Sequence, residues 1–300
     1  MNKKRWIVCA VFASVFLFIL ISWLAGGLLA APANHSIVNP PADFPAEAVQ
    51  FTSESGSLIH GWLVPGKKQS GAVVLMHGVR GDRTDMLDRA RLLSREGYTV
   101  LLFDFQAHGE SPGSHITFGY LESRDARAAV SFVRARAPGE RVGVIGVSMG
   151  GAAALLATPP LDADALVIEM VYPSIDQAID DRLQSKFGKP GRVLVPLLSW
   201  QLKPRLGISP ADLRPIDRVS KIHMPKLFIA GANDEYTKIE ESRAIAAAAA
   251  EPKELWIVDG AKHEDLLRFA GKEYERRVMQ FFDHYLRNNA GVTSSPATGP

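Results

Sequence analysis

Cysteine is almost absent from this chain of 300 residues. Its single cysteine, Cys9, lies inside an apolar N-terminal stretch, so the rest of the chain has no thiol. This excludes a disulfide framework, a zinc site built on cysteines and a thiolate nucleophile in the globular part.

The chain also has little excess charge of either sign. Its 34 lysines and arginines against 32 acidic residues leave a net charge of +2, too small for the phosphate-neutralising surface that nucleic-acid binding needs. The motifs Gly-x-Gly-x-x-Gly and His-Glu-x-x-His are missing, and the segment from Gly61 to Lys67 resembles a phosphate loop but has Lys68 where Mg²⁺ binding requires Ser or Thr. We therefore expect no cofactor, no metal ion and no nucleic acid.

Formal charge is missing altogether from Trp6 until Asp43. The apolar run Trp6 to Leu29 would reach about 36 Å as a helix, enough to cross a hydrocarbon core of about 30 Å. Lys3, Lys4 and Arg5 precede it, which favours a cytoplasmic N-terminus. The sequence predicts an uncleaved transmembrane signal anchor over residues 1–30, in the cell membrane, with the catalytic domain outside the cytoplasm. The alternative is a cleaved signal peptide, with a mature chain that starts near residue 31 or 34.

Composition changes mark the remaining boundaries. Residues 31–45 contain four prolines and are predicted to be a linker. Residues 288–300 are small and polar without periodicity, which predicts a disordered tail. The globular domain is expected to occupy residues 46–287.

Short β-rich runs alternate with amphipathic helical runs inside this domain, which is the pattern of an α/β fold with a mostly parallel sheet flanked by helices. Residues 49–52 and 58–64 flank a turn and predict an opening hairpin. Six buried parallel strands are predicted at 72–76, 99–103, 142–147, 165–171, 227–230 and 255–258.

Residues 176–225 interrupt the alternation with six prolines and an apolar centre, and predict a helical cap insertion. It leaves the domain between two strands, so we expect it to lie over their carboxyl ends. Its apolar residues need a covering surface, which is either the domain, a substrate or the nearby bilayer. The substrate interpretation predicts an acyl pocket lined by Phe187, Leu197, Leu198 and Trp200.

The motif Gly146-Val147-Ser148-Met149-Gly150 lies between a predicted strand and an Ala/Leu-rich helix. A sharp strand-to-helix turn leaves no room for side chains on either side of the serine, which explains both flanking glycines. Ser148 is therefore the candidate nucleophile.

A serine hydroxyl needs a base to take its proton and a carboxylate to orient that base. Among eight histidines, His263 stands out because it follows the last predicted strand and precedes the final helix. Asp234 directly follows the preceding strand and is the candidate acid, with Glu235, Asp217 and Asp212 as competitors.

Several motifs carry a family resemblance. Ser148, Asp234 and His263 follow one another in this order, and they are preceded by the pair His77-Gly78 and by the segment 104–111 (DFQAHGES). The region from 46 to 287 resembles the α/β-hydrolase fold, and within it the membrane-anchored Bem46-like and serine-aminopeptidase-like hydrolases. The resemblance implies an oxyanion hole formed by the backbone N–H groups of Val79 and Met149, with His77 shaping that loop. Gln106-Ala107 departs from the Arg-Gly that relatives often carry.

The resulting functional prediction is a serine hydrolase, carboxylesterase-like, that cleaves esters through an acyl-enzyme intermediate. Its expected partners are a small-molecule or lipid-like acyl substrate and the membrane. A peptidase or acyl thioesterase of the same fold is the enzymatic alternative, and a non-catalytic membrane-anchored scaffold is the other. Arg80 and Arg83 are expected to be solvated charges, or else to meet an anionic substrate.

Overall fold

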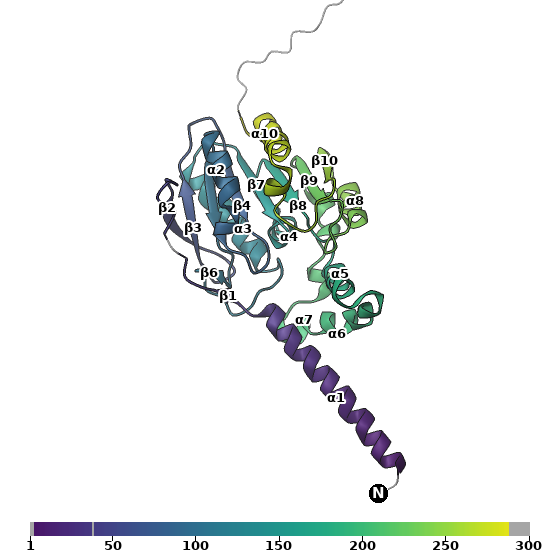
Figure 1. Cartoon of the computed structure of the whole chain (residues 1–300). Coiled ribbons are helices and arrows are strands. Elements are labelled where there is room, and N and C mark those ends of the chain that lie inside the picture. Colours follow the sequence, from purple (N-terminus) through teal and green to yellow (C-terminus); the bar gives the residue numbers. More distant parts are fainter. Residues whose placement is uncertain (1–2, 38, 288–300) are drawn as a thin grey trace, which may run out of the picture.

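The structure is a computed structural model that describes residues 3–37 and 39–287, so the predicted tail at 288–300 lies outside the described residues. A long N-terminal helix projects from a domain in which helices cover both faces of one sheet (Figure 1). This arrangement confirms the predicted α/β class.

Eight strands form the main sheet in the order β10-β9-β8-β7-β4-β5-β3-β2. Six of them run parallel, and β2 and β3 form the antiparallel hairpin at one edge. The strands are β2 (Glu47–Thr52), β3 (Leu58–Val64), β4 (Ala72–Met76), β5 (Thr99–Phe103), β7 (Val142–Val147), β8 (Ala165–Glu169), β9 (Lys226–Gly231) and β10 (Lys253–Val258). The predicted strands agree with these bounds to within two residues.

The central strands are apolar along their whole length because both faces of the sheet are buried. In β4, Val74 and Met76 point into one core with α3 (Glu122–Arg136), α4 (Met149–Leu156) and α8 (Ile239–Ala248). Val73 and Leu75 point into the other core with α2 (Leu87–Arg95) and α10 (Lys272–Leu286). The strands are thus packed between two hydrophobic cores, which fix the positions of the loops that follow the strands.

Helix α1 (Lys3–Ala30) contains one stretch, Trp6–Ala30, that is long and apolar enough to cross a membrane. Its mean hydropathy is 2.8, and none of its most apolar window is buried against the domain. The predicted apolar helix is therefore present, as a candidate membrane anchor or signal sequence.

The segment after α1 is attached to the domain. Strand β1 (Ala33–Asn34) pairs in parallel with β6 (His108–Gly109), and the Asn34 side-chain amide donates to the carbonyls of Gly109 and Ser111. The prediction of a linker gave no hint of this pair, because a two-residue strand shows no periodicity.

The predicted cap insertion is helical and lies between β8 and β9. It comprises α5 (Ile175–Phe187), α6 (Val195–Trp200), α7 (Leu202–Leu206) and several short 3₁₀ turns. Helices α6 and α7 lie beside the domain end of α1, at the same end of the molecule as β1 and β6 (Figure 1). Because β6 follows the carboxyl end of β5, α1 approaches the carboxyl edge of the parallel sheet.

Candidate active site

Ser148 lies in the sharp turn between β7 and α4. Its backbone has φ 51° and ψ −111°, a conformation that is strained for any residue other than glycine. A Cβ at Gly146 would come within 2.8 Å of the Gly150 backbone, and one at Gly150 would collide with the carbonyl oxygens of Met76 and His77. The two glycines are therefore required by close backbone contacts.

His263 lies between Ser148 and Asp234 and contacts both. Its Nε2 is 3.2 Å from the Ser148 Oγ, and its Nδ1 is 2.7 Å from the Asp234 Oδ2. These distances lie within or at the limit of the hydrogen-bond range expected of a nucleophile, a base and an orienting acid. The structure thus brings together three side chains that are separated by up to 115 residues in sequence.

Three further hydrogen bonds hold Asp234 in place. Its Oδ1 accepts the backbone N–H groups of Tyr236 (2.7 Å) and Thr237 (2.9 Å), and its Oδ2 accepts the Thr237 hydroxyl (2.7 Å). Burial alone would raise the pKa of Asp234, but hydrogen bonds from His263 and Thr237 outweigh burial and hold this pKa below its usual value. The carboxylate is therefore charged and fixed in orientation.

The competing acids lie elsewhere. Glu235 is exposed and accepts a hydrogen bond from Ser185 on the cap, at 3.0 Å. Asp212 accepts from Ser209, and Asp217 pairs with Arg214. Of the four carboxylates considered from the sequence, only Asp234 contacts His263 in the structure.

The two backbone amides expected to form the oxyanion hole belong to different loops. Val79 follows β4 through Gly78, and Met149 opens helix α4, whose N-terminus favours negative charge. Within residues 3–37 and 39–287, neither N–H donates a hydrogen bond outside regular ladders, so both are free for a ligand. Their role as an oxyanion hole stays a prediction.

His77 holds the loop that carries Val79. Its Nδ1 lies 2.7 Å from the Gly78 carbonyl and its Nε2 accepts the Phe105 N–H at 3.1 Å, a pair of contacts that requires the neutral ring. Burial first, and the nearby His108 second, lower the pKa of His77 to about 3. His77 thus remains neutral and structural, which agrees with the loop-shaping role that the resemblance implies.

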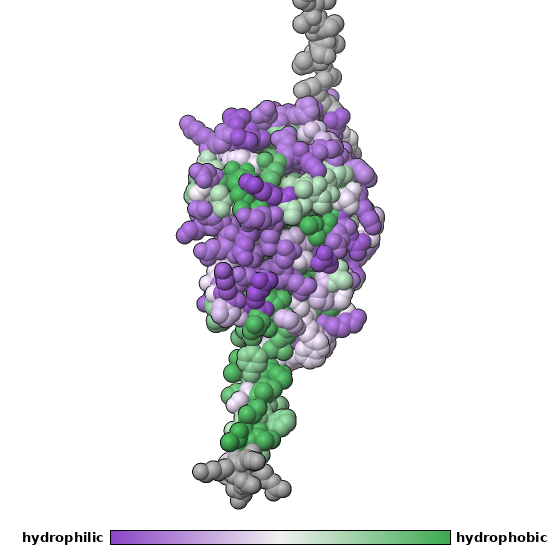
Figure 2. All heavy atoms as spheres, turned by 90° about the vertical axis from the view of Figure 1, so that its right-hand side faces the viewer, coloured by the Kyte–Doolittle hydropathy of each residue, from purple (hydrophilic) through white to green (hydrophobic). Residues whose placement is uncertain are grey.

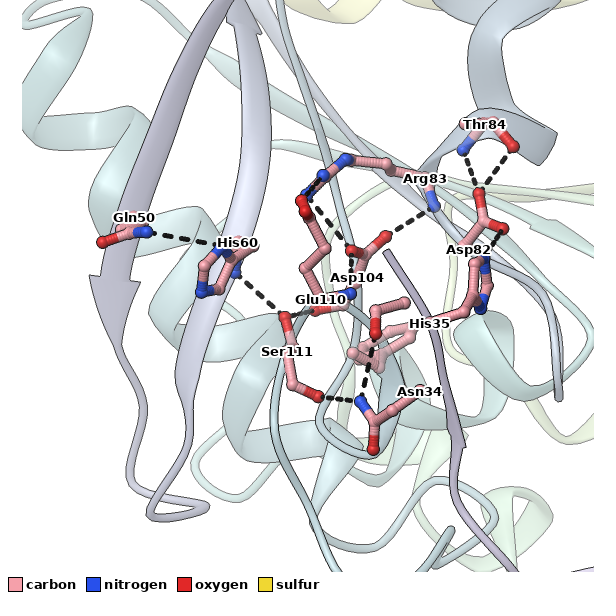
Figure 3. Close-up of polar contacts among 12 residues, drawn as sticks. Asn34, His35, Gln50, His60, Asp82, Arg83, Thr84, Asp104, Glu110 and Ser111 are labelled. Atoms are coloured by element: carbon pink, nitrogen blue, oxygen red, sulfur yellow. Dashed lines mark hydrogen bonds and ion pairs between the residues drawn. The ribbon is translucent and has the colours of Figure 1, made fainter. Parts of the chain in front are cut away.

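Residues of the segment 104–111 take part in a group of polar contacts around Asp104 (Figure 3). The buried Asp104 carboxylate accepts the N–H groups of Arg83 (2.8 Å) and Glu110 (2.9 Å), and pairs with the Arg83 guanidinium at 3.1 Å. Arg83 is only 3% exposed, so the expectation that it is solvated is wrong: it neutralises a buried carboxylate. Ala107 has φ 59°, a left-handed backbone conformation that favours glycine.

Sequence reasoning missed a buried ionic network under the candidate site. Arg89 on α2 donates to both oxygens of Glu169, at 2.8 and 3.2 Å, and to Asp265 at 3.1 Å. The N–H of Ser148 in turn donates to the Glu169 carbonyl at 2.8 Å. Asp265 lies two residues after His263 and caps α9 (Leu266–Ala270). The network therefore links the turn of the nucleophile to the loop of the base.

One feature of the sequence could have revealed this network: Glu169 is a carboxylate at the end of an otherwise apolar strand. A buried charge of this kind needs a partner. Tyr236 was also missed: its ring packs against His263 at 5.6 Å, while Arg182 of the cap lies 4.5 Å above the same ring. The cap therefore contacts the candidate triad through one aromatic ring.

The four residues predicted to line an acyl pocket occupy different surroundings. Phe187 and Trp200 are 63% and 60% exposed, and Leu197 and Leu198 are half-buried. A pocket of about 580 Å³ lies beside Asp234, between α5 and the loop after β9, and none of the four residues lines it. Their role in substrate binding stays a prediction.

The described part of the chain contains no group of three or more His, Cys, Asp or Glu side chains that could hold a metal ion. The contacts of His263 place an oriented base beside the Ser148 hydroxyl, an arrangement that can activate this hydroxyl as a nucleophile.

Known proteins match this chain over most of its length. Residues 67–185 match the family model described as serine aminopeptidase, S33. The uncharacterized protein Rv2307c of Mycobacterium tuberculosis is 30% identical over 222 residues, which cover 72% of each chain. The α/β-hydrolase domain-containing protein WAV2 of Arabidopsis thaliana is 24% identical and covers 80% of this chain and 79% of its own. A crystal structure of the Pyrococcus furiosus esterase Pf2001 superposes with a TM-score of 0.70 and 26% identity, covering 85% of this chain and 99% of the esterase.

Proposed function

The chain belongs to the α/β-hydrolase superfamily, and from this premise we propose that it is a serine hydrolase that cleaves carboxylic esters through an acyl-enzyme on Ser148. The observation that carries the proposal is the continuous line of contacts from Asp234 through His263 to the Ser148 hydroxyl. The fold alone does not carry it, because one fold serves many functions.

In the proposed reaction, the Ser148 Oγ attacks the ester carbonyl carbon while His263 Nε2 takes the hydroxyl proton. The carbonyl oxygen becomes an oxyanion, which the N–H groups of Val79 and Met149 stabilise. The tetrahedral intermediate collapses when His263 gives its proton to the departing alcohol. Water, activated by the same imidazole, then releases the carboxylic acid and regenerates Ser148.

Asp234 keeps the proton of His263 on Nδ1, so that Nε2 is free to accept. Its two backbone donors and the Thr237 hydroxyl hold the carboxylate in one rotamer, which fixes the imidazole in turn. The positive charge on His263 during attack is balanced by a carboxylate that stays ionised, consistent with its lowered pKa.

The test is covalent labelling of the full-length protein by a fluorophosphonate probe, with Ser148→Ala as the matched negative variant. We expect one labelled serine in the parent chain and no labelling in the variant, because the probe reacts only with an activated hydroxyl. Unlabelled parent protein that is correctly folded would favour the non-catalytic scaffold and remove the catalytic proposal.

A panel of substrates distinguishes the remaining enzymatic alternatives. Acyl nitrophenyl esters should be cleaved more efficiently than acyl thioesters or aminoacyl amides of matched acyl group. The family description of serine aminopeptidase favours an amide substrate, whereas the esterase neighbour favours an ester. Higher kcat/KM on aminoacyl amides would assign a peptidase instead.

We further propose that α1 anchors the protein in the cell membrane, with the catalytic domain outside the cytoplasm. The apolar helix with basic residues only before it supports this topology. Protease added outside intact spheroplasts should digest the domain, and N-terminal sequencing of the mature protein should still find the first residues. A mature chain that begins near residue 31 or 34 would establish a cleaved signal peptide.

A further inference from the structure

The cap exposes an unusual concentration of apolar side chains. Five large hydrophobic residues beyond α1 are more than about a third exposed in the described part of the chain, and three of them, Phe187, Val193 and Trp200, lie within 14 consecutive cap residues. The other two, Leu58 and Phe269, lie on separate elements. The exposed side chains of Phe187–Leu206 are called the cap face below.

The segment that forms the cap face contains basic residues and no acidic ones. Between Phe187 and Leu206 the sequence contains Lys189, Arg192, Lys203 and Arg205 and no acidic residue. Arg192 pairs with Asp180 of α5 at 3.5 Å, which leaves three basic side chains in excess. Aromatic and aliphatic side chains mixed with lysine and arginine are typical of segments that lie in the headgroup layer of a membrane. A hydrophobic protein partner would not require this excess of positive charge, whereas anionic phospholipids attract it.

Direct contacts attach the cap, beside the cap face, to the domain end of α1. The Gln201 Nε2 donates to the Ser22 hydroxyl (3.0 Å) and carbonyl (3.2 Å), and the Arg205 guanidinium donates to the Trp23 carbonyl at 2.6 Å. The rings of Trp23 and Trp200 are 6.2 Å apart, and Arg205 lies 4.2 Å above the Trp23 ring.

Two glycines of α1 make this approach possible. A Cβ at Gly26 would collide with the Gln201 side-chain oxygen, and one at Gly27 would lie 3.0 Å from the Arg205 guanidinium. In Figure 2 the hydrophobic surface of α1 reaches the base of the domain, and most of the remaining visible surface is hydrophilic. The contact between Trp23 and Trp200 joins the apolar helix to the cap face.

The length of α1 sets the level of these contacts. Trp23 lies about 26 Å along the helix from Trp6, and Ala30 about 36 Å, at about 1.5 Å per residue. A hydrocarbon core of about 30 Å that begins near Trp6 ends between Trp23 and Ala30. Tryptophan is enriched at both membrane interfaces, which suits this placement of Trp6 and Trp23. The cap face thus meets α1 at the level of the second interface.

From these observations we propose that the cap face lies in the headgroup layer of the membrane and binds anionic phospholipids. This inference rests on the proposed anchoring by α1 and is independent of the proposed catalysis. It gives Phe187, Val193 and Trp200 a covering surface, and it places the cationic side chains where lipid phosphates can neutralise them.

Fluorescence quenching in lipid vesicles tests the proposal on the full chain. The single natural cysteine, Cys9, lies in α1 and reports anchoring when labelled with an environment-sensitive fluorophore. In a Cys9→Ser background, Val193→Cys reports the cap face. Lys68→Cys is the control, because it is exposed in the turn before β4, at the amino edge of the sheet and away from α1.

Vesicles of phosphatidylcholine and phosphatidylglycerol carry a lipid spin-labelled near the headgroup. We expect quenching of the labels at positions 9 and 193 and none at 68. Spin-labelled phosphatidylglycerol should quench at position 193 at least twofold more than spin-labelled phosphatidylcholine. Lys189→Glu with Arg192→Glu should abolish this preference without changing the quenching at position 9.

Each contrary result has a distinct meaning. Quenching at position 9 but not at 193 would overturn the proposed cap face while leaving the anchor intact. Absence of quenching at position 9 would remove the proposed anchoring, and this inference with it. A blue-shifted emission at 193 that no spin-labelled lipid quenches would mean that a second copy of the chain covers this face, which also overturns the proposal.

Discussion

Replacing Asp234 by asparagine should change the tautomer of His263 and thereby disable Ser148. Two backbone N–H groups point at Oδ1 and require an acceptor there, so the amide oxygen of the introduced side chain has to occupy that position. The amide NH₂ then occupies the Oδ2 position, which faces His263 Nδ1 at 2.7 Å. His263 must accept this hydrogen bond at Nδ1 and carry its proton on Nε2, where it cannot take the proton of Ser148.

The expected loss is about 10⁴-fold in kcat, or about 5.4 kcal/mol of activation free energy, with the fold unchanged. The assay is steady-state hydrolysis of a nitrophenyl ester by the detergent-solubilised chain. Glu235→Gln is the matched control, since this neighbouring carboxylate is exposed and contacts Ser185 instead of His263. We expect less than a twofold change in the control. Near-normal activity of Asp234→Asn together with a large loss in Glu235→Gln would refute the reasoning and reassign the acid.

Three further perturbations test the supports of the site. Glu169→Gln should destabilise the fold by about 3 kcal/mol, measured as a lower Tm, because Arg89 is buried and keeps only Asp265 as a charged partner. Gly150→Ala should destabilise the fold by about 1–3 kcal/mol and abolish probe labelling, since its Cβ meets backbone carbonyls that cannot move independently; normal labelling would show that the turn relaxes. Burial lowers the pKa of His77 to about 3 in the folded chain, whereas in the unfolded chain the ring gains a proton below its ordinary pKa of 6.5. This contribution to stability is therefore fully present above pH 6.5 and is lost as the pH falls toward about 3. Chemical unfolding at pH 7 and pH 5 should show a decline that His77→Gln reduces, and an equal decline in both proteins would contradict it.

The strands and the candidate triad were predictable because each left a local pattern. Parallel strands buried on both faces appear as continuous apolar runs, and the Ser148 turn requires glycines that the sequence displays. His263 and Asp234 were identified from their positions after strands, and the contacts among all three agree with that prediction.

Features that depend on distant partners were not predictable. Arg83 looked like a surface charge because its partner, Asp104, is 21 residues away. The ring of Tyr236 beside His263, and the contacts of Gln201 and Arg205 with α1, follow from tertiary packing alone. The same is true of the pairing of β1 with β6, which is too short for any periodicity to reveal.

This short β1–β6 pair determines how freely the domain moves relative to α1. The backbone bonds from Ile116 to the Ala30 carbonyl and from Ala33 to the Ala107 carbonyl leave no slack after the helix. Under the proposed topology, the Ser148 hydroxyl is therefore held at a constant height and tilt above one leaflet instead of swinging on a tether. Turnover of a lipid-like ester should then follow its mole fraction in the membrane plane, so that dilution with inert lipid slows the reaction at constant bulk concentration.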